Sequence, residues 1–523
     1  MVSLIERIEN NSDLNSVEKD LRFLASNKRT LQVSELIDKA IEKCKKLGNK
    51  KTLVLLYGHK ILIIYNYREN IQLASDIIDE MLYVSEEIEF KEGMAWALSY
   101  KWYIEKFKGN KKASTQALVK AMSIIRNTKC NDEYIYNFVQ YSYAMERWLE
   151  EHDTSIIKIL EECLDFYYNN GFYRSFAQSL GFLGIIHIRY QNSKEILYMS
   201  KKIIANRTFF NSLQSDIQGI IYYFIGLGYL LNANLSFAET YFSESDRILK
   251  PQYKKTIYFS NYIILQSHIA TVKALQGRLE ESLIVTKEVE KLLEQDFFNK
   301  NLELNTKKQI FHTLNLNKFY VYSRFKEFNS KEMQDLIEEI YEGCKNLYSD
   351  FMLLSEFILN ANLEYAKMKN LITSDNFSLN RVKHIISFII QKRDSKEESN
   401  DRKHLQRIEI LNKRERNEKT TFIENALADL LIAQQLFLLK QYEEIYALLR
   451  KYEKQLHRIE VLELRVFMEA FIQVGAYKNG DSLGPALQYM AIKKCRQYGF
   501  SRLENNLLDY LNMQRNDALR LSS

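Results

Sequence analysis

Glycine and proline are scarce in this chain of 523 residues, which contains 16 glycines and 2 prolines. Hairpin turns, sandwich loops and phosphate-binding loops depend on these two residues, because they supply backbone conformations that other residues adopt at a cost. The composition therefore argues against most β-rich folds and most nucleotide-binding folds.

Cysteine is also rare, with 5 residues that are widely scattered and form no Cys-x-x-Cys pair. This pattern indicates neither a disulfide framework nor a zinc cluster, and it fits a reducing compartment. The first nine residues are amphipathic and acidic, unlike a signal peptide. The longest uncharged stretch, 217–238, is interrupted by polar side chains and is too short to span a bilayer. We therefore expect a cytoplasmic protein with no metal, no cofactor and no membrane partner.

The charge balance is close to even, with 73 Lys and Arg against 67 Asp and Glu and a net charge of +6. Such a small excess in a chain of this length does not favour a nucleic-acid partner. Hydrophobic residues make up 46% of the chain, which supplies ample material for folded cores and excludes intrinsic disorder.

Apolar residues recur at three- and four-residue spacing through most of the chain, and this period predicts helices. Brief polar turns separate the segments about every 42 residues, so each unit holds a pair of helices. A small residue recurs in phase on the first helix of each unit, at Gly58, Ser99, Ala144, Gly184, Gly226, Ala270 and Ala433.

The clearest unit runs from Tyr222 to Ser245. Its pattern consists of Tyr222, Ile225, Gly226 and Tyr229 before the turn, then Ala238, Phe242 and Ser245 after it. These residues resemble the tetratricopeptide (TPR) motif in type and spacing. A small side chain at Gly226 would let the two helices of the pair cross closely. The period is longer than the 34-residue TPR unit, so we expect longer helices.

We therefore predict an all-α fold, an α-solenoid of TPR-like helix pairs that winds into a right-handed superhelix with a period of about 42 residues. Four segments are expected: an N-terminal helical cap at 1–48, the repeat solenoid at 49–390, a charged linker or exposed helix at 391–419, and a C-terminal helical repeat block at 420–523. The third segment is dense in charges of both signs and lacks an apolar stripe.

Catalytic signatures are missing from the sequence. It contains no Gly-x-x-x-x-Gly-Lys, no Gly-x-Gly-x-x-Gly and no His-Glu-x-x-His. Gly480-Asp481-Ser482-Leu483 matches the name-giving signature of the GDSL hydrolases, but no histidine follows His457 to complete their triad. The sequence therefore predicts that this protein is not an enzyme.

The TPR resemblance implies that the first helix of each unit lines a concave groove. Counting from the small residues gives the predicted groove residues, with polar neighbours beside them: Trp96, Tyr100, Tyr103, Gln140, Tyr141, Met145, Trp148, Gln178, Arg189, Tyr223, Leu227 and His268. Two interpretations stay open. The rings bind an apolar peptide or protein segment, or they only pack neighbouring first helices together.

The layout of residues 50 to 300 also resembles the Rap and arbitrium-receptor type of bacterial and phage peptide-receptor regulators. That resemblance implies a regulator whose superhelix changes pitch when a peptide or protein partner enters it. The alternative is a constitutive scaffold subunit of a multiprotein complex. A homo-oligomer is compatible with either function.

Overall fold

The computed structural model describes most of the chain. The described residues are 2–10, 13–27, 31–67, 71–151, 153–189, 193–255, 259–302, 304–324, 330–346, 422–438, 441–478, 484–498, 504–505 and 507–509. The charged segment predicted at 391–419 lies outside them.

Within these residues every regular element is a helix. The first part of the chain forms α1 (Val2–Glu9), α2 (Leu14–Asn27), α3 (Leu31–Leu47), α4 (Lys50–Tyr67), α5 (Ile71–Glu87), α6 (Lys91–Phe107), α7 (Lys111–Asn127), α8 (Glu133–Glu151), α9 (Ile156–Asn169) and α10 (Tyr173–Arg189). Then come α11 (Ser193–Ala205), α12 (Arg207–Ser212), α13 (Ser215–Leu231), α14 (Leu235–Leu249), η1 (Tyr253–Lys255), α15 (Phe259–Leu275), α16 (Leu279–Glu294), α17 (Asp296–Asn301), α18 (Leu304–Tyr322) and α19 (Lys331–Asn346). The described helices near the C-terminus are α24 (Phe422–Leu438), α25 (Tyr442–Leu449), η2 (Arg450–Arg458), α26 (Leu462–Lys478) and α27 (Gly484–Gln497).

Two of the few glycines sit in turns that only glycine enters without strain. Gly109 follows α6 and Gly277 follows α15, each with a φ of +82°. Beyond Gly109, the amide of Asn110 donates to the carbonyl of Glu105 at 2.8 Å, which closes the end of α6. The next helix begins one residue later, so the chain reverses in a very short turn.

The chain divides into two compact units. Unit 1 comprises Met1–Ile186, Lys202–Ile221 and Arg247–Phe259, and unit 2 comprises His187–Lys201, Tyr222–Asp246 and Ser260–Ser523. The division follows spatial packing rather than chain order, and it passes through several helices.

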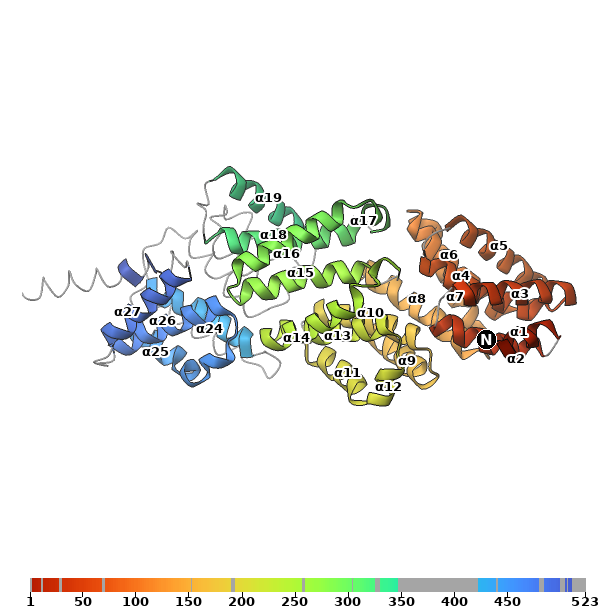
Figure 1. The fold of residues 1–523 in the computed structure, drawn as a ribbon, viewed down its shortest axis with the longest axis horizontal. Helices are drawn as coiled ribbons and strands as arrows, with labels where there is room; N and C mark the ends of the chain where they lie inside the picture. The colour runs from red at the N-terminus through yellow and green to blue at the C-terminus, as the bar shows by residue number, and fades with distance from the viewer. Residues whose placement is uncertain are drawn as a thin grey trace, which may run out of the picture. The chain divides into compact units, whose positions relative to one another are not determined.

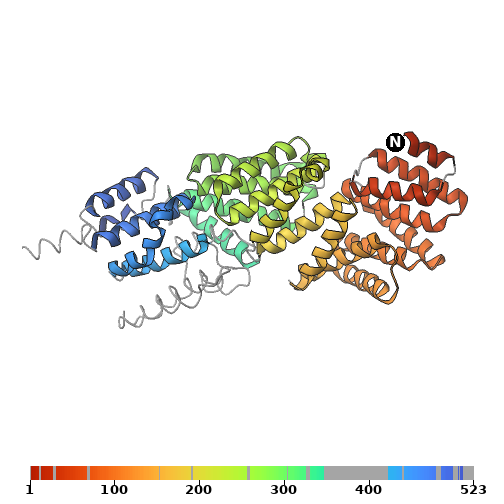
Figure 2. The same ribbon diagram turned by 90° about the horizontal axis from the view of Figure 1, so that it is seen from below.

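In unit 1, helices that follow one another in the chain pack side by side. This holds from α2 through α9, and α4 and α8 also contact α6, which lies between them in the chain (Figure 1). Figure 2 shows these helices, coloured from red to orange, from below. Packing of each helix pair on the next is the arrangement of TPR-like solenoids.

Unit 2 follows the same rule over its described helices. Neighbouring pairs include α16 with α18, α18 with α19, and the run from α24 to α27. Segments far apart in the chain also meet here, because Glu460 accepts hydrogen bonds from both the amide and the hydroxyl of Ser236.

The small residues that recur in phase are buried at helix crossings. A methyl group at Gly226 would lie 2.5 Å from a ring carbon of Phe242, and one at Gly58 would lie 2.4 Å from the ring of Trp96. No side chain fits at either place unless a buried ring moves. The predicted close crossing of the helices at Gly226 is therefore present in the structure. The period of about 42 residues and the four segment boundaries stay predictions.

Candidate functional site

Three of the predicted groove residues in unit 1 are buried. Trp96 is fully buried, and Tyr100 and Trp148 are nearly so. The ring of Trp96 lies 5.2 Å from that of His59 on α4 and 5.9 Å from that of Tyr134 on α8. These distances are those of packed aromatic pairs, so this ring binds neighbouring first helices to one another.

Five other predicted residues of unit 1 are only half-buried. We call them the open row: Tyr103, Gln140, Tyr141, Met145 and Gln178. The hydroxyl of Tyr141 donates to the carbonyl of Gln178 at 3.4 Å, which links α8 to α10. The open row therefore combines rings, a thioether and amides on adjacent first helices.

Two of the predicted residues of unit 2, Tyr223 and His268, pack against one another. Tyr223 and Leu227 are buried, and the rings of Tyr223 and His268 stack at 5.9 Å with an interplanar angle of 8°. Phe242 stacks on both rings. Burial lowers the pKa of His268 to about 4, so its imidazole is neutral at physiological pH. Arg189 ends α10, and its side chain lies outside the described residues.

Helix α2, the second helix of the chain, contacts three of the first helices of unit 1, α4, α8 and α10. The hydroxyl of Thr52 on α4 donates to the side-chain oxygen of Asn15 at 2.7 Å. Further along α2, Glu18 meets His59 in the middle of α4. Counting from Gly58 as for the other units places His59 at a groove position. We define the first-helix face as the groove-side surface of α4, α6, α8 and α10. By this definition α2 contacts the first-helix face.

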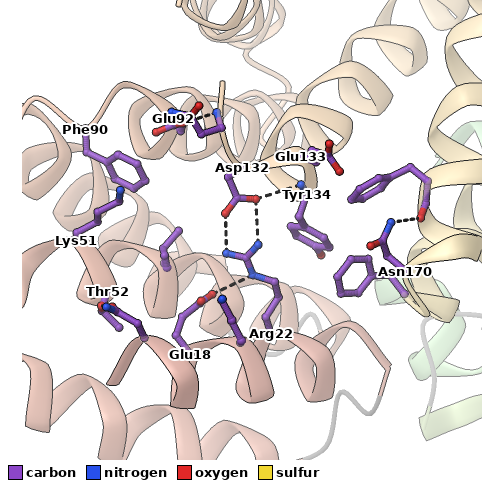
Figure 3. Close-up of a pocket in the computed structure, with 16 residues that line it drawn as sticks. Glu18, Arg22, Lys51, Thr52, Phe90, Glu92, Asp132, Glu133, Tyr134 and Asn170 are labelled. Carbon is purple, nitrogen blue, oxygen red and sulfur yellow. Dashed lines mark hydrogen bonds and ion pairs between the residues drawn. The ribbon is translucent and has the colours of Figure 1, made fainter. Parts of the chain in front are cut away.

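A charge network, buried at Glu18 and half-buried at Arg22 and Asp132, holds α2 to the start of α8 (Figure 3). The guanidinium of Arg22 donates to both carboxylate oxygens of Asp132, at 3.0 and 2.7 Å, and to Glu18 at 3.0 Å. Asp132 also accepts from the amides of Tyr134 and Ile135 and so caps α8. The bidentate pair fixes both the position and the direction of the Arg22 side chain.

The ionisation of this network follows from its burial. Burial opposes a negative charge on Glu18, but the hydrogen bond from His59 and the charge of Arg22 outweigh it, so the pKa of Glu18 lies below its ordinary value. Burial lowers the pKa of His59, despite its contact with Glu18. A neutral His59 therefore donates its Nε2 hydrogen to the Glu18 carboxylate at 2.7 Å.

The end of α2 reaches the next first helix. The hydroxyl of Ser26 donates to the hydroxyl of Tyr134 at 3.2 Å. The side-chain amide of Asn27 donates to the carbonyl of Gly171, and its oxygen accepts from the amide of Tyr173, both at 2.8 Å. One short helix therefore contacts α4, α8 and α10.

A pocket of about 560 Å³ lies beside α2 in unit 1 (Figure 3). One side is formed by α2, through Glu18 and Arg22, and the other by α4, the start of α8 and the loops before α6 and α10. Phe90 is one of the aromatic residues that line the pocket, and the ammonium nitrogen of Lys51 lies 5.0 Å from the centre of its ring. The helix therefore leaves part of this surface unfilled.

Sequence reasoning missed the network of Glu18, Arg22, His59 and Asp132. A signal was present, since Glu18, Arg22 and Ser26 stand at four-residue spacing and therefore share one face of a helix. A polar stripe at this spacing is usually solvated, and here it is directed inward.

In the part of the chain that the structure describes, no helix has the length and apolar character needed to cross a membrane. Over the same residues, no group of three or more His, Cys, Asp or Glu side chains could hold a metal ion.

Comparison with known proteins gives a likeness to solved structures and none to named families. No protein-family model matches the sequence, and no curated protein matches it. A solved structure similar to it is the crystal structure of NprR in complex with its cognate peptide NprX, with 12% sequence identity and a TM-score of 0.44. The likeness covers 73% of this chain and 100% of that one.

Proposed function

We propose that this chain is a non-catalytic receptor that binds a peptide or protein segment on the first-helix face of unit 1, and so acts as a regulator. One observation carries the proposal: α2, a helix of 14 residues, already lies across α4, α8 and α10 through specific side-chain contacts. A surface that holds one polypeptide segment has the shape and the hydrogen-bonding groups to hold another.

The open row extends this face along α6, α8 and α10. Tyr103, Tyr141 and Met145 offer apolar area that adapts to different side chains, since a ring needs few rotamers and a thioether is flexible. Gln140 and Gln178 can each donate to and accept from a peptide backbone. None of the five residues is charged, so the proposed ligand presents an apolar or uncharged stretch to them.

The buried rings are a poor choice for testing this function. Truncating Trp148 or Tyr100 to alanine would leave a cavity, at a cost of about 3 to 5 kcal/mol for residues of this size. Lost binding would then be inseparable from lost folding. The half-buried residues Tyr103 and Tyr141 avoid this difficulty.

The test uses the full chain and an array of random synthetic peptides. We expect selected peptides to bind the unaltered chain, and to bind the Tyr103→Ala and Tyr141→Ala variants roughly tenfold or more weakly, because aromatic side chains carry much of the energy at such sites. Tyr83 on α5 is the matched control, since it is highly exposed and outside the open row. Tyr83→Ala should leave the affinity unchanged.

Two outcomes would count against the proposal. If no peptide binds, while a folded protein partner does, the chain is the scaffold of the alternative hypothesis. If peptides bind equally well to all three tyrosine variants, the open row is not their site. Circular dichroism of each variant confirms that folding is intact.

A further inference from the structure

The position of α2 exceeds what an end cap requires. A cap has to cover the apolar side of the first helix pair, and Val17, Leu21 and Ala25 of α2 are buried and suited to that task. Yet Arg22 reaches Asp132, which lies 110 residues later in the chain, and Asn27 reaches Gly171. Neither of these partners belongs to the first pair.

The contacts beyond the first pair are polar. Glu18, Ser26 and Asn27 are all buried, and each is hydrogen-bonded to the first-helix face. Buried polar contacts add less net stability than apolar residues of the same size, but they specify which partner binds and in which register. The polar side of α2 therefore makes its contacts specific for one sequence pattern, but it stabilises the bound position less than a fully apolar interface would.

The receiving side has contacts of its own that do not involve α2. Asp132 accepts hydrogen bonds from the amides of Tyr134 and Ile135 at the start of α8. The ring of Tyr134 packs on Trp96 and on Phe172, at 5.9 and 4.9 Å. The pocket beside α2 shows that this surface is also wider than the helix that lies on it.

We propose that this surface is a receptor for an amphipathic helix of defined pattern, and that α2 occupies it in cis until a partner helix replaces it. The recognised pattern is an acid, an arginine and a serine at four-residue spacing, followed by an asparagine. His59 receives the acid, Asp132 the arginine, Tyr134 the serine and the α9–α10 turn the asparagine. The inference rests on the proposed function, because both use the first-helix face.

The direct test uses α2 itself as the probe. A fluorescent synthetic peptide with the sequence of Leu14–Asn27 is titrated into the full chain carrying Arg22→Ala and Asn27→Ala, which weaken the helix in cis. We expect saturable binding to this variant, and at least roughly tenfold weaker binding to the unaltered chain, where the tethered α2 competes at high effective concentration. A peptide that itself carries Arg22→Ala should bind neither chain.

The receiving side provides a matched variant. Asp132→Asn can still cap α8, since asparagine is an equally good capping residue, but it removes the charge that meets Arg22. When Asp132→Asn is combined with Arg22→Ala and Asn27→Ala in the full chain, we expect the unaltered peptide to bind about tenfold or more weakly than to the double variant alone. Equal binding of the unaltered and Arg22→Ala peptides would overturn the proposal, as would a folded double variant that binds no peptide.

A second measurement covers the case in which the double variant does not fold. Hydrogen exchange on the unaltered chain should show faster exchange of the α2 amides when excess peptide is present, with the first helices unchanged. Unchanged α2 protection would overturn the proposal, and so would peptide-independent dimers in gel filtration, which would identify α2 of a second copy as the occupant. The variants Tyr103→Ala and Tyr141→Ala should bind the α2 peptide normally, which separates this test from that of the proposed function.

Discussion

Two kinds of contact between helices of different repeats can be compared in the two units, an ion pair and a ring stack. In unit 1, ion pairs join helices of different repeats: the half-buried pair of Arg22 and Asp132 joins α2 to α8, and the buried pair of Arg174 and Asp216 joins α10 to α13. In unit 2, the stacked rings of Tyr223 and His268 join α13 to α15, and Gly226 of α13 lies against Phe242 of α14. The same repeat pattern therefore supports two kinds of helix contact.

The difference matters for what each contact can do. A charged pair must be in one register to be satisfied, and it resists the wrong helix strongly because an unpaired buried charge is costly. Stacked rings are stabilised by the apolar area that they bury and by the fit of their shapes, so a small displacement costs them less free energy than it costs a charged pair. Unit 1 is therefore suited to selecting a partner helix, and the ring stack of unit 2 to holding helices together.

The largest effect is expected at Arg174. Its guanidinium donates to Asp216 at 2.6 Å, and the two side chains are only 8% and 4% exposed. Arg174→Met leaves a carboxylate buried without its cation, which typically costs about 3 to 5 kcal/mol. The midpoint of urea unfolding measures this loss.

Two further variants sharpen the result. Adding Asp216→Asn to Arg174→Met should recover part of the stability, since a neutral amide replaces the buried charge. Lys101→Met breaks an exposed pair with Asp79 and should change the free energy of unfolding by less than about 1 kcal/mol. Arg174 and Lys101 both lie in unit 1, so equal losses from Arg174→Met and Lys101→Met would show that burial gives the Arg174–Asp216 pair no added weight there.

An intermediate effect is expected at Gly226 in unit 2. Gly226→Leu would push into the ring of Phe242, and overpacking of this kind costs about 1 to 3 kcal/mol. A lower melting temperature is the expected readout. Ser243→Leu, at an exposed position on the neighbouring α14, adds the same side chain without a clash and should leave the melt unchanged. A normal melt for Gly226→Leu would show that the crossing is not tightly packed.

The features that could be predicted from the sequence are the local ones. Helix pairs follow from three- and four-residue spacing, and Gly226 was predicted at a helix crossing because its motif lies within one unit. The pairing of Arg22 with Asp132 could not be predicted in this way, since the residues are 110 positions apart and the spacing on one helix does not identify a partner on another. A charged residue on a helix is also more often solvated than buried.

The candidate groove was predictable only as a row of positions. Counting along the repeats predicts both Trp96 and Tyr103 as groove residues. In the structure Trp96 is fully buried and Tyr103 is half-buried. Their difference depends on which rings the neighbouring helices bring against them, such as Tyr134 of α8 against Trp96. Which rings meet depends on the tertiary packing of the helices, and the spacing of residues along the sequence does not contain that information.

The smallest effect is a pH dependence in the ring stack of unit 2. The pKa of His268 is lowered by burial from 6.5 to about 4, so below pH 6.5 the unfolded chain takes up a proton that the folded chain does not. Stability contributed by this group is therefore complete above pH 6.5, falls as the pH drops towards 4, and then levels off. Because the ring is partly exposed, we expect about 1 to 2 kcal/mol from this one group.

The variant His268→Phe isolates that contribution. Phenylalanine keeps a flat ring beside Tyr223 and Phe242 but cannot be protonated, so the decline of stability between pH 6.5 and 4 should become shallower. Urea unfolding across this range measures the slope, and His457→Phe, at an exposed position, controls for the loss of one imidazole. If both variants show the slope of the unaltered chain, His268 is protonated equally in the folded and unfolded states, and the stack is open to water rather than closed like a core.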